Sequence, residues 1–516
     1  MLVPRSSGVL LHPTSLPGRY GIGDLGQWAY NFVDWLESAY QTLWQILPLG
    51  PTSYGDSPYQ TLSAFAGNTY LISFDKLIED GWLSPEDLAD LPPFPRDHVD
   101  FGWIWTYHKY KLTKAYQNFA TRATMPQKKA FADWCDANKD WLDDFALYMA
   151  IKDEHDGRPW VEWEAGVALR DPQALVDAQK RHVENIEDYK FRQWQFFTQW
   201  SELKAYANNK GIKLIGDVPI FIAHDSADVW ANRELFYLDE LGNPTVVAGV
   251  PPDYFSVTGQ YWGNPLYKWD EMAKDGYSWW IRRFKAVQTQ VDIIRIDHFR
   301  GFEAYWEIPT NVERTAVNGQ WVEGPGIPFF RVIEAALGNL PIIAEDLGVI
   351  TEGVEAMRDG LGLPGMKVLQ FAWGNLPEAN LFLPHHHIAN SVVYSGTHDN
   401  NTTNGWWYSN ETNEHIHHHI EKYTNNSVTE PNWTLIRIAE ASVSHMAVVP
   451  MQDVLSLGAD ARMNTPNTSS GNWIWRMVED NFTDREARDR LRDLTLLYGR
   501  AHGTRFIEYL HEHPMI

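Results

Sequence analysis

Eight short runs of apolar and β-branched residues recur along the chain, and most of them end in a polar or charged residue. The runs cover residues 7–13, 42–48, 213–220, 293–297, 341–346, 367–371, 391–396 and 447–453. Several lack the alternation of apolar and polar residues that a half-exposed strand shows, so they are typical of parallel strands buried on both faces. This feature constrains the fold most strongly, because such strands need helices to cover them.

Helix-like segments separate most of these runs. Examples are TEGVEAMRDGLG after the fifth run, FRVIEAALGN before it and NWTLIRIAEASVSH before the last. An alternation of strand and helix with eight strands predicts an α/β fold of the (β/α)8 TIM-barrel class. The alternative is an open doubly wound sheet, but no Gly-rich phosphate-binding loop follows the first strand to favour it.

Two connections are longer than a normal crossover. Residues 71–205 are rich in Trp, Tyr and Lys at helical spacing, so we expect a large, mostly helical insertion after the second strand. Residues 221–290 contain loop-like text such as VVAGVPPDYFSVTGQYWGNPLY, and long loops in a compact protein are usually functional. We therefore expect a catalytic barrel formed by residues 1–70 and 206–516, with an inserted loop subdomain at about 221–290.

Composition narrows the class of protein. A chain of 516 residues with 44% hydrophobic content reads as globular, and a net charge of −24 argues against a nucleic-acid partner. The start MLVPRSSGVL lacks the apolar segment of a secretory signal, and no apolar run reaches membrane-spanning length. The single cysteine, Cys135, excludes an internal disulfide framework. These features predict a cytoplasmic protein with no membrane partner, and they leave the oligomeric state open.

Aromatic residues are unusually frequent, with 25 Trp and 23 Tyr. Each carries a polar atom that needs a partner when it is buried, so these residues are costly as core filler alone. An excess beside many Asp and Asn residues favours a surface that stacks on a flat, hydroxylated ligand. Sugar rings fit this description, because they have apolar C–H faces and polar edges.

Carboxylates stand at or just beyond the ends of four predicted strands. They are Asp217, Asp297, Glu345 with its neighbour Asp346, and Asp399. Taken singly, each is also compatible with a helix cap or a structural salt bridge. In a barrel, however, the active site lies where the strands end, so these side chains should converge at one mouth. Converging carboxylates can bind a divalent cation or cleave glycosidic bonds.

Nine motifs in a fixed order carry a resemblance to a known family. They are GVLLHPTSLPGRYGIGDLG, QILPLGPTSYGDSPYQTLSAFAGN, GDVPIFIAHDSADVW, GVPPDYFSVTGQYWGNPLY, IIRIDHFRGF, PIIAEDLG, GMKVLQF, SGTHDNNTT and LGADARMNTP. The chain resembles the amylomaltases, the 4-α-glucanotransferases or disproportionating enzymes of glycoside hydrolase family 77, nearly end to end. The resemblance implies a barrel, transfer of α-1,4-glucan segments among malto-oligosaccharides through a covalent glycosyl-enzyme, and no cofactor.

The same resemblance assigns the catalytic roles. Asp297 in RIDHFRG resembles the nucleophile, Glu345 in IAEDLG the acid/base, and Asp399 in GTHDN the carboxylate that binds hydroxyls of the donor sugar. Arg295 lies two residues before Asp297, so both point to one face of the strand, and its charge should favour the ionised nucleophile. Glu345 must be protonated to assist the leaving group, so we expect a raised pKa there. Asp346 should point to the opposite face and be structural.

Five further residues resemble sugar-binding positions of the family. His398 adjoins the third carboxylate, and Asp217 lies near the donor site. Tyr59 in GDSPYQ resembles a stacking platform, Trp262 and the PPDYFS segment resemble a loop that closes over the glucan, and Asn464 in ARMNTP belongs to a second flanking loop. Core packing is the alternative for the two aromatic residues, and a supporting structural role is the alternative for His398.

Two histidine clusters raise the question of metal. Residues 385–387 read PHHH with the preceding proline, and residues 415–419 read HIHHH, in which His415 and His419 have the i, i+4 spacing of helical ligands. No metal site belongs to the family pattern, so we expect solvated surface. Two departures from that pattern, Gly374-Asn375 and Asn467, lie on presumed substrate-flanking loops and leave the acceptor preference open.

Three other functions compete with glucan transfer. An α-1,4-glucan hydrolase shares the chemistry as far as the covalent intermediate and differs only in whether water or a sugar resolves it. A non-catalytic glucan-binding protein should lack at least one carboxylate, whereas all three are present. A metal-dependent barrel enzyme predicts inactivation by a chelator.

Overall fold

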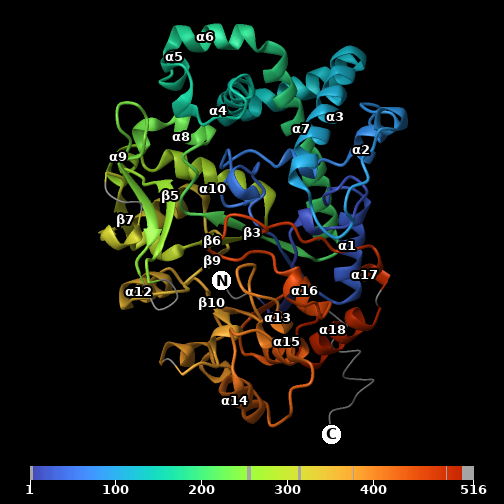
Figure 1. Cartoon of the computed structure of the whole chain (residues 1–516), viewed down its shortest axis with the longest axis vertical. Helices are drawn as coiled ribbons and strands as arrows, with labels where there is room; N and C mark the ends of the chain where they lie inside the picture. Colours follow the sequence, from blue (N-terminus) through green and yellow to red (C-terminus); the bar gives the residue numbers. More distant parts are fainter. Residues whose placement is uncertain (1–3, 253–256, 312–314, 376, 484, 503–516) are drawn as a thin grey trace.

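Eight parallel strands form the central sheet of the protein in a computed structural model that describes residues 4–252, 257–311, 315–375, 377–483 and 485–502 (Figure 1). They are β1 (Ser6–Leu10), β2 (Leu43–Gln45), β3 (Lys213–Pro219), β6 (Ile293–Asp297), β9 (Ile342–Ala344), β10 (Gly365–Val368), β11 (Ser391–Tyr394) and β12 (Met446–Pro450). The order is β10-β11-β12-β1-β2-β3-β6-β9. A hydrogen bond of 2.9 Å from the Ala344 N–H to the Pro364 carbonyl joins the two ends of this order. Each predicted run overlaps one strand, so the (β/α)8 barrel is confirmed.

Helices cover the outside of the barrel. They include α1 (Gln27–Ser38), α10 (Ser278–Gln290), α11 (Gly326–Leu337), α12 (Glu352–Gly360), α13 (Thr403–Trp407), α14 (Glu414–Thr424), α15 (Pro431–Ala441), α16 (Met451–Val454), α17 (Asp480–Thr483) and α18 (Arg485–Leu497). Helix α1 shows why they pack there. It buries Ala29, Phe32, Val33 and Leu36, which follow the i, i+3, i+4, i+7 spacing of one helical face. Within the described residues, no helix combines the length and apolar character needed to cross a membrane.

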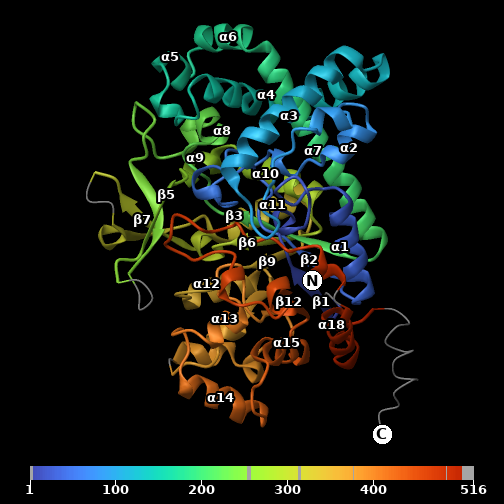
Figure 2. The same ribbon diagram turned by 45° about the vertical axis from the view of Figure 1, so that its right-hand side comes forward.

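A group of helices that connects β2 to β3 in the sequence lies to one side of the barrel (Figures 1 and 2). It contains α2 (Phe74–Glu79), α3 (Phe101–Arg122), α4 (Met125–Glu154), α5 (Ala165–Ala168), α6 (Pro172–Arg181) and α7 (Val183–Asn209). Side chains cap the N-termini of several of these helices. Asp100 accepts a hydrogen bond from the Trp103 N–H at α3, and Asp171 accepts hydrogen bonds from two amides at α6. Helix α7 runs through residue 205, so the insertion and the barrel share one continuous helix.

A second, antiparallel sheet stands beside the barrel mouth (Figure 2). Its order is β5 (Gln260–Pro265), β4 (Val246–Val250), β7 (Ala304–Pro309) and β8 (Gln320–Glu323). The expectation of loop structure over 221–290 was wrong for this part, which also holds helices α8 (Ala227–Ala231) and α9 (Trp269–Lys274). Strand β4 pairs with β7, which follows β6 in the chain. Because this partner lies beyond the segment itself, the local sequence gave no sign of the pairing.

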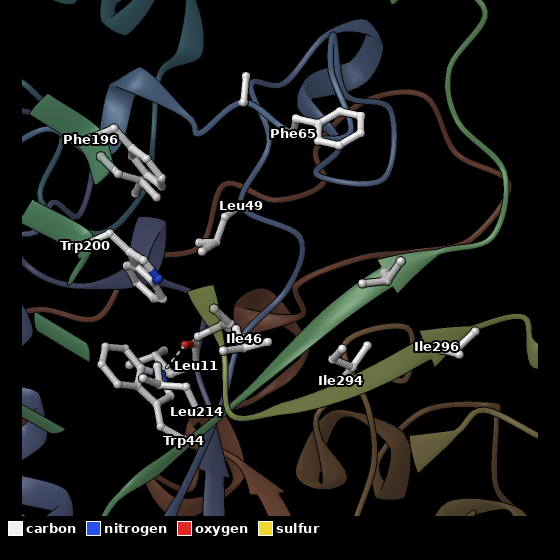
Figure 3. Packing of buried hydrophobic residues seen from close by; sticks show 14 of the residues in the cluster. Leu11, Trp44, Ile46, Leu49, Phe65, Phe196, Trp200, Leu214, Ile294 and Ile296 are labelled. Atoms are coloured by element: carbon white, nitrogen blue, oxygen red, sulfur yellow. Dashed lines mark hydrogen bonds between the residues drawn. The ribbon is translucent and has the colours of Figure 1, made fainter. Parts of the chain in front are cut away.

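Large aromatic side chains fill the layer between the barrel and helix α7 (Figure 3). Trp44 and Trp200 are fully buried, and both indole N–H groups find partners. Trp44 donates to the Leu11 carbonyl at 2.8 Å, and Trp200 donates to the Gln290 carbonyl at 2.9 Å. Many of the 25 Trp residues therefore contribute to the core. The backbone satisfies the indole N–H of Trp44 and Trp200, whereas five other buried indole N–H groups, those of Trp35, Trp269, Trp279, Trp280 and Trp373, have no hydrogen-bond partner among the described residues.

We predict that Gly8→Ala destabilises the barrel. A Cβ at Gly8 would overlap the Cβ and the carbonyl oxygen of Leu43 on the paired strand β2, and the backbone between two parallel strands has little room to move. Such overpacking costs roughly 1 to 3 kcal/mol of unfolding free energy, or more. Gly374→Ala is the matched control, because no heavy atom lies within 4 Å of a Cβ added there. Equal melting temperatures for the two variants would contradict the account.

Candidate active site

One buried arginine gathers three carboxylates at the barrel mouth. The Arg295 side chain on β6 is 4% exposed, and its Nη1 lies 2.5 Å from Oδ2 of Asp217 and 3.2 Å from Oδ1 of Asp297. Its Nη2 lies 3.9 Å from Oε2 of Glu345. Asp217 pairs in register with Arg295 across β3 and β6, and Glu345 follows β9 on the other side of β6. Four predicted site residues thus meet at one guanidinium.

The two central carboxyl groups both hold their protons more tightly than usual. Burial raises the pKa of Glu345 to about 7, while Arg295 and the His298 amide oppose the shift. Burial also raises the pKa of Asp297 well above its usual range; Arg295 lowers it in part, and the charge of Glu345 raises it further. The expected rise at Glu345 is confirmed in direction. The expectation for Asp297 considered only Arg295 and missed the larger effect of burial.

The residue next to Glu345 faces away from this cluster. Asp346 accepts from Nη1 of Arg358 at 2.6 Å and from the Met366 N–H at 2.7 Å. These bonds join the end of β9 to helix α12 and strand β10, so Asp346 supports the barrel wall. This agrees with the alternation of side chains expected along a strand.

Asp399 lies beyond the end of β11, and its carboxylate contacts two other predicted site residues. Asn464 donates from Nδ2 to Oδ1 of Asp399 at 2.7 Å, and Nε2 of His398 lies 3.4 Å from Oδ2. The Asp399 side chain is 49% exposed, so its carboxylate remains accessible to a ligand. Burial lowers the pKa of His398, which favours a neutral imidazole there.

Sequence reasoning missed Arg462, which joins the loop after β11 to the loop after β12. Arg462 donates from Nη2 to the Asp399 carbonyl at 2.8 Å and from Nε to the Asn464 carbonyl at 2.7 Å. Its Nη1 lies 3.4 Å from Oε1 of Glu411. Arg462 stands within the motif ARMNTP, but nothing in the local pattern distinguishes it from a surface arginine.

A pocket opens beside His398 and Arg462, between the ends of β1, β11 and β12. Asn400 and His12 also line it. His12 accepts at Nδ1 from the Leu47 N–H at 3.2 Å, and burial lowers its pKa to about 3. The pocket therefore offers neutral and cationic polar groups next to the accessible carboxylate.

Tyr59 lies in the site rather than in the core alone. Its hydroxyl donates to Oδ2 of Asp217 at 2.7 Å, and its ring stacks on His398 at 5.1 Å between centroids and 16° between planes. Trp473, which the sequence did not single out, lies 5.8 Å from the same ring. One face of Tyr59 is thus occupied by His398. A sugar would have to contact the remaining face or the ring edge.

Strand β5 brings Trp262 to the end of β6. The Trp262 ring meets His298 edge to face, at 4.8 Å between centroids and 85° between planes. Residues 253–256 of the PPDYFS segment lie outside the described residues. The small antiparallel sheet is what positions Trp262, because β5 is held by β4 and through it by β7.

The histidine clusters show no arrangement for metal in the ranges the structure describes, where no group of three or more His, Cys, Asp or Glu side chains could hold an ion. The expectation of solvated surface was wrong for three of these histidines. His387 is buried and bonds to Oγ of Ser442 at 2.7 Å. His417 and His419 are half-buried against the rings of Trp407 and Trp373, at 3.8 and 5.5 Å between centroids. The fold thus brings a hydroxyl group to one of these rings and a tryptophan to each of the other two. Asn467, one of the two departures from the family pattern noted in the sequence, has a positive φ of 63°, which asparagine tolerates better than most residues.

Similarity to known proteins identifies the family of this chain. A family model described as 4-alpha-glucanotransferase matches residues 11–481. The chain belongs to the 4-alpha-glucanotransferase family. A family member from Synechocystis is 49% identical over 97% of this chain and 99% of its own length, and one from Thermus thermophilus is 50% identical over 93% and 96%.

Solved structures of family members extend the likeness to three dimensions. The amylomaltase from Streptococcus agalactiae, solved in complex with acarbose, is 42% identical with a TM-score of 0.92 and covers 96% of this chain and 100% of that chain. The amylomaltase from Corynebacterium glutamicum has a TM-score of 0.77 over 95% of this chain and 75% of that chain. At 17% identity, the second likeness concerns the fold alone.

We predict that Tyr59→Ala weakens glucan binding with little effect on folding. Loss of a stacked aromatic contact of roughly 1 to 3 kcal/mol lowers affinity about tenfold to a hundredfold. Substrate affinity and melting temperature are measured on the same preparation. Tyr110→Ala is the matched control, because Tyr110 is 64% exposed on helix α3. A large fall in melting temperature with unchanged affinity would assign Tyr59 to packing instead.

Proposed function

We propose that the protein is a retaining 4-α-glucanotransferase that moves α-1,4-glucan segments from a donor to the 4-hydroxyl of an acceptor glucan or glucose. The observation that carries the proposal is the pair Asp297 and Glu345 on one guanidinium, at 3.2 and 3.9 Å. A shared guanidinium places a candidate nucleophile and a candidate acid/base at one barrel mouth, and a retaining mechanism needs this pair of carboxyl groups. Membership of the family supports the same reaction.

In the first half-reaction, the Asp297 carboxylate attacks the anomeric carbon of the donor sugar. Glu345 gives its proton to the glycosidic oxygen, and the bond between that oxygen and the anomeric carbon breaks. The products are a glycosyl ester on Asp297 and a shortened glucan. In the second half-reaction, Glu345 takes the proton from an acceptor 4-hydroxyl, whose oxygen displaces Asp297 from the anomeric carbon. No net oxidation or proton loss occurs.

The reaction needs one proton on the pair of carboxyl groups formed by Asp297 and Glu345. The negative charges of the two carboxylates repel each other, so loss of the first proton makes loss of the second more difficult. Arg295 lies closer to Asp297 than to Glu345, at 3.2 against 3.9 Å, and so favours the negative charge on Asp297. We infer that the working state has an ionised Asp297 and a protonated Glu345.

The other site residues take binding roles in this proposal. Asp399, His398 and Asn464 present acceptors and donors to the donor sugar's hydroxyls, and Tyr59 and Trp262 offer aromatic surface to glucose rings. The acarbose complex of the similar Streptococcus agalactiae amylomaltase supports a saccharide ligand. The partners are therefore α-1,4-glucans and malto-oligosaccharides. All of these residues lie outside 71–205, which supports a catalytic barrel with a separate helical insertion.

Hydrolysis of α-1,4-glucans is the second candidate, because water could resolve the same ester. Incubation with maltotriose separates the two reactions. Transfer yields a ladder of longer and shorter oligosaccharides with glucose, while the number of reducing ends stays constant. A steady rise in reducing ends without longer products would establish a hydrolase.

We predict that Asp297→Asn nearly abolishes transfer while the fold is retained. The amide has the shape of the carboxylate but is not an effective nucleophile. Transfer from maltotriose and the melting temperature are measured together. Wild-type turnover in a pure preparation would remove Asp297 from this role.

We predict that Glu345→Gln is severely impaired with maltotriose but much less so with a glycosyl fluoride. Fluoride departs without protonation, so the first half-reaction no longer needs the acid. The ratio of kcat/KM on the two donors is compared with the wild-type ratio. An equally deep defect on both donors would show that Glu345 is not the acid.

A further inference from the structure

His298, directly after Asp297, adopts an unusual backbone conformation. Its φ of 53° and ψ of 50° lie in the left-handed region, which only a few per cent of non-glycine residues occupy, with asparagine, aspartate and histidine the most frequent among them. Strand β6 ends at Asp297, and the 3-10 helix η7 (Phe299–Phe302) begins one residue after His298. Strained backbone of this kind persists where the surrounding structure requires it, and it is concentrated at functional sites.

Two successive amides at this turn contact Glu345, and the left-handed φ and ψ of His298 orient the second of them. The His298 N–H donates to Oε2 of Glu345, and the Phe299 N–H donates to the Glu345 carbonyl at 3.2 Å. In the other direction, the Glu345 N–H donates to the Ile296 carbonyl at 3.1 Å. Three bonds therefore attach Glu345 to the end of β6.

The imidazole of His298 has different surroundings. Its ring packs against Trp262 at 4.8 Å and lies 6.5 Å from the Phe221 ring. Burial, followed by the charge of Arg300, lowers its pKa to about 3, so the ring is neutral at ordinary pH. The side chain thus fills space between aromatic rings, whereas the backbone contacts the carboxylate.

We propose that His298 is a positioning residue for Glu345, and that the left-handed turn at this residue, which keeps the His298 and Phe299 amides together on Glu345, is its essential contribution. The inference rests on the proposed function, which assigns the acid/base role to Glu345. Without the amide, the carboxyl group would be free to rotate away from the glycosidic oxygen. A rotation of this kind reduces catalysis strongly even when substrate binding is unchanged.

The charges around Glu345 determine the expected pH effect. Arg295, Asp297 and Asp217 face it from β6 and β3, and Asp399 faces it from the loop after β11. The His298 amide favours the ionised carboxylate, so its loss should raise the pKa of Glu345 further. Transfer needs the protonated acid and declines as pH rises through this pKa. Loss of the amide contact should therefore move the alkaline decline in kcat/KM to higher pH.

Two matched variants separate the backbone from the imidazole. His298→Asn and His298→Val both remove the ring, but asparagine tolerates the left-handed region and β-branched valine does not. We expect the Val variant to lose about tenfold to a hundredfold more kcat on maltotriose than the Asn variant, with similar KM. Only the Val variant should show the shifted alkaline decline. His298→Gly, which relieves the strain, should behave as Asn.

The controls keep each result decisive. If the Val variant does not fold, His298→Ala takes its place, since alanine is also disfavoured in this conformation, with a correspondingly smaller loss expected. Equal losses of kcat in the Asn, Gly and Val variants, or in the Asn, Gly and Ala variants, would overturn the inference and assign the role to the imidazole. The wild type is assayed in parallel. Failure of the wild type to form a maltotriose ladder would instead overturn the proposed function and the inference with it.

Discussion

The buried guanidinium of Arg295 is the interaction on which the rest of the site depends. Carboxylates from three neighbouring strands, Asp217, Asp297 and Glu345, would repel one another in a buried mouth without a cation among them. A single cation does not neutralise all three, which fits the raised pKa values of Glu345 and Asp297. In the proposed mechanism, this imbalance makes one carboxyl group available as an acid while another is ionised as a nucleophile.

The surrounding polar groups extend from this cation as a continuous chain. Asp217 accepts from the Tyr59 hydroxyl, the Tyr59 ring stacks on His398, and His398 lies beside Asp399. Asn464 then joins the loop after β11 to the loop after β12. Apart from the contact between His398 and Asp399, which share one loop, each contact joins different strands of the barrel or the loops that follow them. The closed barrel is therefore what allows residues far apart in sequence to act on one sugar.

Much of this arrangement could be predicted from the sequence, because its causes are local or topological. The eight buried strands follow from apolar runs without alternation, and the convergence of Asp217, Asp297 and Glu345 follows from their places at the ends of neighbouring parallel strands. The antiparallel sheet could not be predicted. Its strands β4 and β7 pair with each other although β6 lies between them in the sequence. Short runs with a central Gly, such as β4, also carry little strand signal.

The electrostatic details escaped prediction for a different reason. The spacing of Arg295 and Asp297 indicated an ion pair, but the effect of burial on Asp297 depends on everything that packs around the mouth. Arg462 and Trp473 lie on loops whose course only the fold determines. The same is true of His387. Its neighbours in the sequence suggest an exposed position, but the fold buries it in a hydrogen bond to Ser442.

The most direct test of the account is the location of the covalent intermediate. Glu345→Gln enzyme is incubated with α-maltotriosyl fluoride, digested at acidic pH, and its peptides are weighed by mass spectrometry. The account predicts one maltotriosyl unit on the peptide that contains Asp297, because Arg295 favours the ionised form of that carboxyl group. A stable adduct on the peptide of Asp217 or Asp399, with Asp297 unmodified, would contradict it.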